Sequence, residues 1–515
     1  MRKLAPKFVA LLSLALAVAF LTPLRAVADD DEEDPPSRVA RLSHTDGAVS
    51  FNPAGTDEWV ETVINRPMTT GDKLWSDNGG RAELNMGSAS LRIGSNTGFN
   101  FLNLTDSVAQ IQVTEGTVRV RVKRLEQDET IEIDTPNLAF SVLRPGTYRI
   151  DVNEAGDSTV VSVLNGEGEV TGGGQAYSVH ARQTATFNGT DQLDADVQDS
   201  NGYDDFDQWC ADRDRREDNS ASARYVSPDV IGSEDLDEYG GWRPVPEYGT
   251  VWFPHTTVVG WAPYRYGHWV YIAPWGYTWV EDEPWGFAPF HYGRWVTVGG
   301  VWGWVPAPAP VVGVVYVRPV YAPALVAWVG GPRFAVGVGV GGAAAVGWFP
   351  LGPREIYAPS YRTSRRYITN VNVTNTRVET TVVNNYYTNV VVNKQVNVTN
   401  VTYVNQRVNG AVTATSGATF TSGRSVSRDV VRVDQREIVS SHVVVGAPTI
   451  APTRQAYIGS GAVSRVRPPN MIATRTVVVR TAPPPPPPSF DRQQAAIREN
   501  GGRPMAVREM RQQPA

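Results

Sequence analysis

Several residues whose side chains bind metals in other proteins lie close together in the sequence. They are, in chain order, His255, His268, Glu281, Asp282, Glu283 and His291. Imidazole nitrogens and carboxylate oxygens are ligands that zinc accepts. The flanking sequence, however, repeats: Gly260–Val270 (GWAPYRYGHWV) resembles Gly286–Val296 (GFAPFHYGRWV). At both repeated histidine positions the other copy carries arginine, which is not an ordinary metal ligand, so we expect no metal and no cofactor here.

The same region contains ten tryptophans between Trp242 and Trp304. Each can bury on the order of 150–250 Å², so one interpretation is that they form the core of small β-hairpins. The alternative is a platform of rings that binds a cell-wall glycan or a peptide. Its candidate ligand-binding residues are Tyr266, His268, Trp269, Tyr292, Arg294 and Trp295. Nucleic acid is excluded as a partner because this region lacks the positive groove that stacked bases require.

Catalytic patterns are missing from the sequence. There is no nucleophile elbow, no metal-binding histidine pair and no Ser/His/Asp arrangement in a recognisable context. We therefore predict no catalytic residues and no enzymatic activity. Glu132 and Asp134 share one face of a predicted strand, and for these carboxylates we expect a solvated surface.

The elements that position these residues are mainly β. Residues 38–195 alternate with period two: Val118, Val120 and Val122 face one way and the intervening basic residues the other. This pattern predicts an antiparallel β-sandwich or rolled β-sheet with one solvated face. Hairpin turns are expected at Thr114–Thr117, Asn153–Ser158 and Asn165–Gly166. Exposed edges of this domain would either accept a partner strand or be covered internally.

An acidic connector, residues 196–238, follows the β-domain. Within it Asp204–Asp218 predicts a short amphipathic helix, because Phe206, Trp209 and Cys210 fall on one face. That face should dock on a neighbouring domain. Cys210 is the only cysteine, so we expect either a small buried hydrophobe or an intermolecular bridge.

The rest of the chain divides by composition. Residues 239–355 form the aromatic β-hairpin repeat module, in which each copy is expected to be strand, turn, strand. Residues 356–423, rich in Asn, Val and Thr, predict a β segment. Residues 424–515 are rich in Arg and Pro, and this low-complexity C-terminal region predicts a largely disordered tail, with a stiff polyproline spacer at Pro483–Pro488.

The N-terminus has the form of a secretory signal peptide, residues 1–28, followed by an acidic linker, residues 29–37. We expect a periplasmic or secreted protein with no transmembrane span after cleavage, the alternative being a retained anchor. From Arg424 to the end there are 14 arginines and 6 acids, a net charge of +8. The expected mature chain before Arg424 carries −18, so the two parts should attract each other or opposite partners.

Parts of the sequence resemble two known families. Thr70–Leu102, Val113–Val122 and Thr135–Val170 resemble the FecR domain of periplasmic iron-dicitrate sensors. In that family the domain passes a receptor signal through a membrane helix to an anti-sigma segment, whereas here a cleavable signal peptide stands in that place. Tyr266–Trp269 and Tyr292–Trp295 resemble the Tyr-Gly-x-Trp element of a Trp-rich repeat domain of unknown function, often found after FecR-type domains.

Three functions remain open. The favoured one is an exported, non-enzymatic FecR-like binding or scaffold protein of the bacterial cell envelope that senses a ligand or partner. The first alternative is an envelope signal receptor of the FecR anti-sigma regulator type. The second is a cell-wall or glycan-binding protein that uses the aromatic module. The expected partners are accordingly an envelope protein or a cell-wall glycan.

Overall fold

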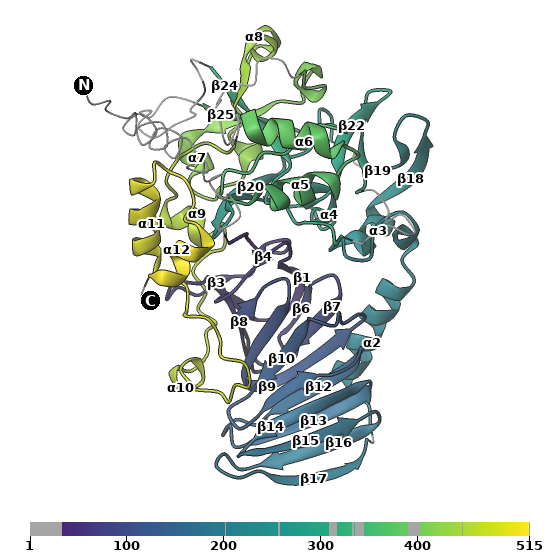
Figure 1. Cartoon of the computed structure of the whole chain (residues 1–515), viewed down its shortest axis with the longest axis vertical. Helices are drawn as coiled ribbons and strands as arrows, with labels where there is room; N and C mark the ends of the chain where they lie inside the picture. The colour runs from purple at the N-terminus through teal and green to yellow at the C-terminus, as the bar shows by residue number, and fades with distance from the viewer. Residues whose placement is uncertain are drawn as a thin grey trace, which may run out of the picture.

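The computed structural model describes residues 33–200, 202–255, 258–307, 317–331, 334, 345–389, 402–444 and 446–513. The predicted signal peptide lies outside the described residues. Figure 1 shows a stack of strands in the lower half of the molecule and the aromatic module in the upper half, with the C-terminal helix α10 beside the strands. Within the described ranges no helix combines the length and apolar character needed to cross a bilayer.

The first domain is a sandwich of two sheets, which confirms the predicted mainly β class. Sheet 1 contains, in spatial order, β4 (Pro67–Met68), β1 (Ala40–Asp46), β6 (Arg81–Asn85), β7 (Ala89–Ile93), the second half of β9 (Val108–Val122), β12 (Gly146–Val152), β13 (Ser158–Asn165), β16 (Gln183–Asn188) and β17 (Asp194–Asp199). Sheet 2 contains β3 (Val60–Glu61), β2 (Val49–Asn52), β5 (Lys73–Ser76), β8 (Thr97–Leu104), the first half of β9, β10 (Thr130–Asp134), β11 (Ala139–Val142), β14 (Glu167–Gly172) and β15 (Gln175–His180). All described pairs are antiparallel except β9 with β10.

Strand β9 belongs to both sheets, and two of the predicted hairpin turns are wrong because the chain passes from one sheet to the other there. The expected turn at Thr114–Thr117 is a bend inside β9, where Gly116 has φ +91° and a Cβ would lie 2.4 Å from the backbone of Asn96. Asn165–Gly166 does not join neighbouring strands, because it carries the chain from β13 in sheet 1 to β14 in sheet 2. The turn at Asn153–Ser158 is confirmed and joins β12 to β13.

The alternation in β9 is confirmed by the packing. Val118, Val120 and Val122 are buried in the core between the sheets, and Arg119 faces the opposite side, where it contacts the connector. The first half of β9 alternates in the same way, with Ile111 inward and Gln110 outward.

The connector forms the predicted helix, α2 (Asp205–Asp218), which begins at the capping side chain of Asp204. Phe206 and Cys210 are buried, whereas Trp209 is half-buried. Cys210 is a free thiol, and burial raises its pKa to about 12. The helix also docks through ion pairs that the sequence did not predict, such as Arg92 with Asp214 at 2.6 Å. The connector ends in the short elements η1 (Ala221–Arg224), η2 (Ser233–Asp235) and α3 (Leu236–Tyr239).

The aromatic module is built from hairpins that each pair two tryptophans across their strands. The hairpins are β18–β19 (Gly240–Val245, Gly249–Pro254), β20–β21 (Gly267–Ile272, Gly276–Glu281), β22–β23 (Arg294–Val298, Val301–Val305) and β24–β25 (Val326–Gly330, Ala345–Pro350). The facing pairs are Trp242–Trp252, Trp269–Trp279, Trp295–Trp304 and Trp328–Trp348. Before β22 the second copy forms the short helix α4 (Ala288–His291). The expected strand–turn–strand repeat is therefore confirmed for the two full copies.

Glycine lets a ring of the facing strand lie on the backbone. A Cβ at Gly267 would lie 2.7 Å from the ring of Trp279, and one at Gly293 would lie 2.5 Å from the ring nitrogen of Trp304. Each of these glycines precedes the first tryptophan of its hairpin by two residues. The spacing Gly-x-Trp is therefore a packing requirement of the hairpin.

The expected β segment at residues 356–423 is mostly wrong. It contains α5 (Arg365–Val373), α6 (Thr380–Tyr387), η4 (Asn405–Arg407) and α7 (Gly417–Phe420), with one short strand, β26 (Thr413–Ser416). Tyr367, Ile368 and Val371 are buried at positions i, i+1 and i+4, a spacing that places all three on one face of a helix but not of a strand. Residues 390–401 of this segment lie outside the described ranges.

The largely disordered tail is also a wrong prediction. Residues 424–513 contain η5 (Val426–Arg428), α8 (Gln435–Ser440), β27 (His442–Val444), α9 (Arg454–Ile458), α10 (Asn470–Ala473), α11 (Phe490–Glu499) and α12 (Val507–Gln512). Strand β27 completes the sheet β26–β25–β24–β27. Tyr457, Phe490 and Ile497 belong to the same core as the tryptophans. These few apolar residues are spread through a mostly polar sequence, so its composition predicted disorder.

Candidate binding site beneath the C-terminal strap

The structure places five of the six proposed platform residues inside the protein. Trp269 is 0% exposed, Trp295 is 1% exposed, and His268, Tyr292 and Arg294 are also buried; the sixth, Tyr266, is half-buried. The ring of Trp269 is surrounded by four others at 5.0–5.5 Å: Trp279, Trp328, Trp348 and Phe420. The rings form the core, and these five side chains lie inside it. Ligand binding by the module stays a prediction, for which only the half-buried Tyr266 of the six presents surface.

The polar members of the repeat bind protein groups. Arg294 donates to the carbonyl of Glu355 at 3.0 Å, and burial lowers its pKa to about 10. One ring nitrogen of His268 lies 3.1 Å from Asp282 Oδ1 and the other 3.1 Å from Ser460 Oγ. His291 packs on Phe287 and Tyr321, and burial lowers its pKa to about 3. The described residues contain no group of three His, Cys, Asp or Glu side chains placed to hold a metal.

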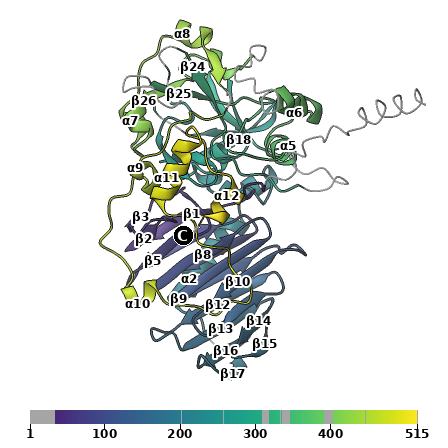
Figure 2. The same ribbon diagram turned by 60° about the vertical axis from the view of Figure 1, so that its left-hand side comes forward.

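A different site lies on the outer face of sheet 2, where residues 459–489, here called the strap, cross the first domain. Figures 1 and 2 show this segment leaving the upper body, descending along the sandwich to α10 and returning. Near its start it extends the edge strand β3: Glu61 N donates to Ala462 O at 2.8 Å, and Ser464 N donates to Trp59 O at 2.8 Å. The β3 edge is therefore covered internally.

The strap covers Glu132 and Asp134, so the prediction of a solvated surface for them is wrong. Both are 0% exposed. Glu132 Oε1 accepts hydrogen bonds from the backbone N–H groups of Arg480 at 2.9 Å and Thr481 at 3.0 Å, and Glu132 Oε2 accepts from the Thr481 hydroxyl at 2.7 Å. One carboxylate thus holds two successive residues of an extended segment through backbone and hydroxyl groups.

Neighbouring side chains complete this contact. Gln110 Nε2 donates to Thr481 O at 2.7 Å and to Asp134 Oδ2 at 2.8 Å. Asp134 Oδ1 has no hydrogen-bond partner among the described side chains. Burial, with the adjacent Glu132, raises the pKa of Asp134 to about 9, so this carboxyl group keeps its proton at neutral pH.

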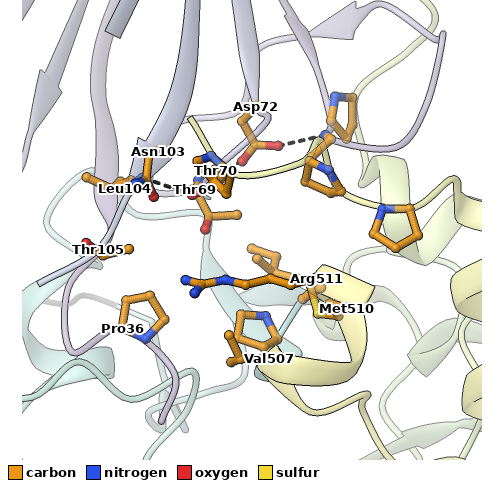
Figure 3. Close-up of a pocket in the computed structure, with 18 of the residues that line it drawn as sticks. Pro36, Thr69, Thr70, Asp72, Asn103, Leu104, Thr105, Val507, Met510 and Arg511 are labelled. Carbon is orange, nitrogen blue, oxygen red and sulfur yellow. Dashed lines mark hydrogen bonds between the residues drawn. The ribbon is translucent and has the colours of Figure 1, made fainter. Parts of the chain in front are cut away.

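The proline run of the strap ends in a second contact, where the first domain, the aromatic module and the tail meet around a cavity of about 100 Å³. Figure 3 shows Thr69, Thr70 and Asp72 facing this cavity from one side, and Val507 and Met510 from another. The remaining walls include Tyr271, Ile272, Pro274, Tyr457, Pro484, Pro485, Pro487 and Pro488.

Two glycines of the first domain seat the prolines. A Cβ at Gly55 would lie 2.4 Å from the carbonyl oxygen of Pro488, and one at Gly71 would lie 2.9 Å from the ring of Pro487. Asp72 fixes the turns that carry these glycines, because it accepts hydrogen bonds from Ala54 N at 2.9 Å and Thr69 N at 2.8 Å. Burial raises the pKa of Asp72 to about 6.

Sequence reasoning missed this site because its two halves lie about 350 positions apart. Each half looked ordinary: an alternating strand with acidic residues and a low-complexity tail with prolines. The one signal that connects them is the charge difference between the tail and the preceding chain.

Comparison with known proteins gives two family matches. The model described as FecR protein matches residues 72–169, and the model described as a family of unknown function, DUF6600, matches residues 233–355. Two crystal structures of a candidate anti-sigma factor from Parabacteroides distasonis, at 1.65 and 2.50 Å resolution, are each similar with 14% identity and a TM-score of 0.23. Each match covers 25% of this chain and 60% of the other. No curated protein matches this chain. The chain thus contains a region similar to FecR proteins, residues 72–169, followed by a region similar to the DUF6600 family, residues 233–355.

Proposed function

We propose that the protein is a non-enzymatic binding or scaffold protein of the bacterial cell envelope, periplasmic or secreted, whose FecR domain holds extended polypeptide against sheet 2. The observation that carries this proposal is the buried Glu132, which accepts three hydrogen bonds from two successive residues of an extended segment. Sheets that bind peptides usually recognise the peptide backbone by strand addition at an edge; here a side-chain carboxylate on the face of the sheet binds the backbone N–H groups instead.

The proposal is tested by photocrosslinking in cells, followed by fractionation. A photoreactive residue at Ser141, on the outer face of sheet 2 beside Arg480, should give adducts with another polypeptide in the envelope fraction. The matched control is Thr184, on the outer face of sheet 1, which should give none. A chain that stays in the cytoplasm, or that yields only adducts to its own strap, would refute the proposal.

The second candidate is an envelope signal receptor, which the FecR match favours. It differs from the first in keeping an N-terminal membrane anchor in place of a cleaved signal peptide. N-terminal sequencing of the protein isolated from its envelope distinguishes them: a start near Asp29 supports the first candidate, and an intact N-terminus supports the receptor.

A further inference from the structure

The outer face of sheet 2 buries polar side chains, whereas the strap that covers it leaves apolar side chains exposed. Gln110, Glu132 and Asp134 are fully buried, whereas Val463 of the strap is 72% exposed and Val479 is 39% exposed. A segment held for packing alone would bury its own apolar side chains. Here the domain instead buries a carboxyl pair, which costs free energy unless hydrogen-bond partners are supplied. The arrangement is that of a receptor face and a ligand.

The contacts define what this face reads. Glu132 accepts hydrogen bonds from two successive backbone N–H groups and from a hydroxyl group. Gln110 donates to the carbonyl oxygen of the residue that carries this hydroxyl, Thr481. On the preceding residue, Arg480 pairs with Glu169 at 2.6 Å. The recognised pattern is therefore a basic residue, a threonine or serine, and then prolines that reach the seat at Gly55 and Gly71.

The main apolar anchors of the strap lie at its two ends, outside this face. The strap is tied at one end by α9, whose Tyr457 is buried, and at the other by α11, whose Phe490 and Ile497 are buried. Between these anchors few side chains are buried: Pro468, Ile472 and Pro488 are the main ones. The strap is therefore a tethered segment that competes at high effective concentration for its own domain.

We propose that the face around Glu132 is a binding site for an extended segment of a partner protein with a basic residue, a threonine or serine, and a following proline run, and that the strap is an internal ligand which this segment displaces. The proposal rests on the proposed function and names the chemistry of its partner.

The test uses the full chain and a fluorescent peptide of residues 476–489 (TVVVRTAPPPPPPS), with binding measured by anisotropy. Thr481→Val in the chain removes the hydroxyl bond of the strap and leaves the face intact. A hydrogen bond to a charged group corresponds to roughly tenfold or more in affinity, so the peptide should bind this variant about tenfold more tightly than the wild-type chain. Thr474→Val is the matched control, because that hydroxyl donates only to Asn470 O within α10, and it should behave as wild type.

Adding Glu132→Gln to the Thr481→Val chain should weaken peptide binding at least tenfold, with an unchanged circular dichroism spectrum. A peptide with valine at the position of Thr481 should lose affinity for the Thr481→Val chain to a similar extent. Equal binding to the wild-type and Thr481→Val chains, binding that does not depend on Glu132, or exchange of tails between two copies in place of peptide binding would each overturn the proposal. Envelope adducts from Ser141 without peptide binding would overturn this partner chemistry and leave the proposed function standing.

Discussion

The buried pair beneath the strap makes a measurable prediction about pH. Burial and the adjacent Glu132 raise the pKa of Asp134 from 3.8 to about 9, so the folded protein binds one more proton than the unfolded chain between these values. The stabilisation from the protonated carboxyl is complete below pH 4 and is lost as the pH rises towards 9. The slope is about 1.4 kcal/mol per pH unit, which reaches up to about 4 kcal/mol at pH 7.

The substitution Asp134→Asn supplies a neutral side chain of the same shape and needs no proton. The free energy of unfolding of wild type should therefore fall relative to that of the variant by about 1.4 kcal/mol for each unit from pH 5 to pH 8. Urea denaturation followed by circular dichroism at four pH values measures this difference. Asp128→Asn, in the exposed turn before β10, removes the same formal charge without touching the pair and is the control.

Parallel curves for wild type and Asp134→Asn would refute this account. They would mean that the carboxyl group is ionised in the folded protein, and that Glu132 and Asp134 are separated by water in solution. A steeper curve for the variant would also contradict it, because removing a proton-binding group cannot increase proton uptake on folding.

Three further predictions concern packing. Trp269→Ala should destabilise the protein by about 3–5 kcal/mol and the half-buried Trp242→Ala by less, as measured by thermal melting; equal losses would contradict the core assignment. Gly55→Ala should release the proline end of the strap and accelerate its proteolysis, whereas Gly79→Ala, at an equally positive φ but with no atom within 4 Å of the added Cβ, should not. Cys210 should react slowly with a thiol reagent in the folded chain and rapidly in urea, because it is buried and its pKa is raised; fast labelling of native protein would show that α2 does not stay docked.

The sequence predicted the features that depend on neighbouring residues. The inward valines of β9 and the Trp-paired hairpins were recognisable because side-chain alternation and turn residues are local signals. The same signals failed at Gly116 and Gly166. A glycine with positive φ allows a sharp change of chain direction, but it does not determine whether the next strand belongs to the same sheet.

The ordered conformation of the strap could not be predicted, because the residues that hold it in place lie in another part of the chain. The strap is held largely by backbone hydrogen bonds to side chains such as Gln110 and Glu132, about 350 positions away. Between its anchored ends it buries few apolar side chains, Ile472 among them. A tail read by itself lacks enough apolar surface to fold. Its order depends on a surface that the first domain supplies.

The two outer faces of the sandwich explain why the chain separates acidic from basic segments. Sheet 1 presents the cations Arg92, Arg119, Arg121, Lys123 and Arg149, and the acidic helix α2 covers them. Sheet 2 presents the carboxylates Glu132 and Glu169, with the protonated Asp134 beside Glu132, and the basic tail covers them. Like charges would oppose an exchange of the two covers, so each segment has one face on which it can dock. Helix α2 makes a dense set of ion pairs with sheet 1. The strap has few ion pairs and is held mainly by hydrogen bonds, among them those to Glu132 and Gln110 and the backbone bonds to Glu61 and Thr135. This difference is why we propose sheet 2, and not sheet 1, as the face on which a competing segment binds.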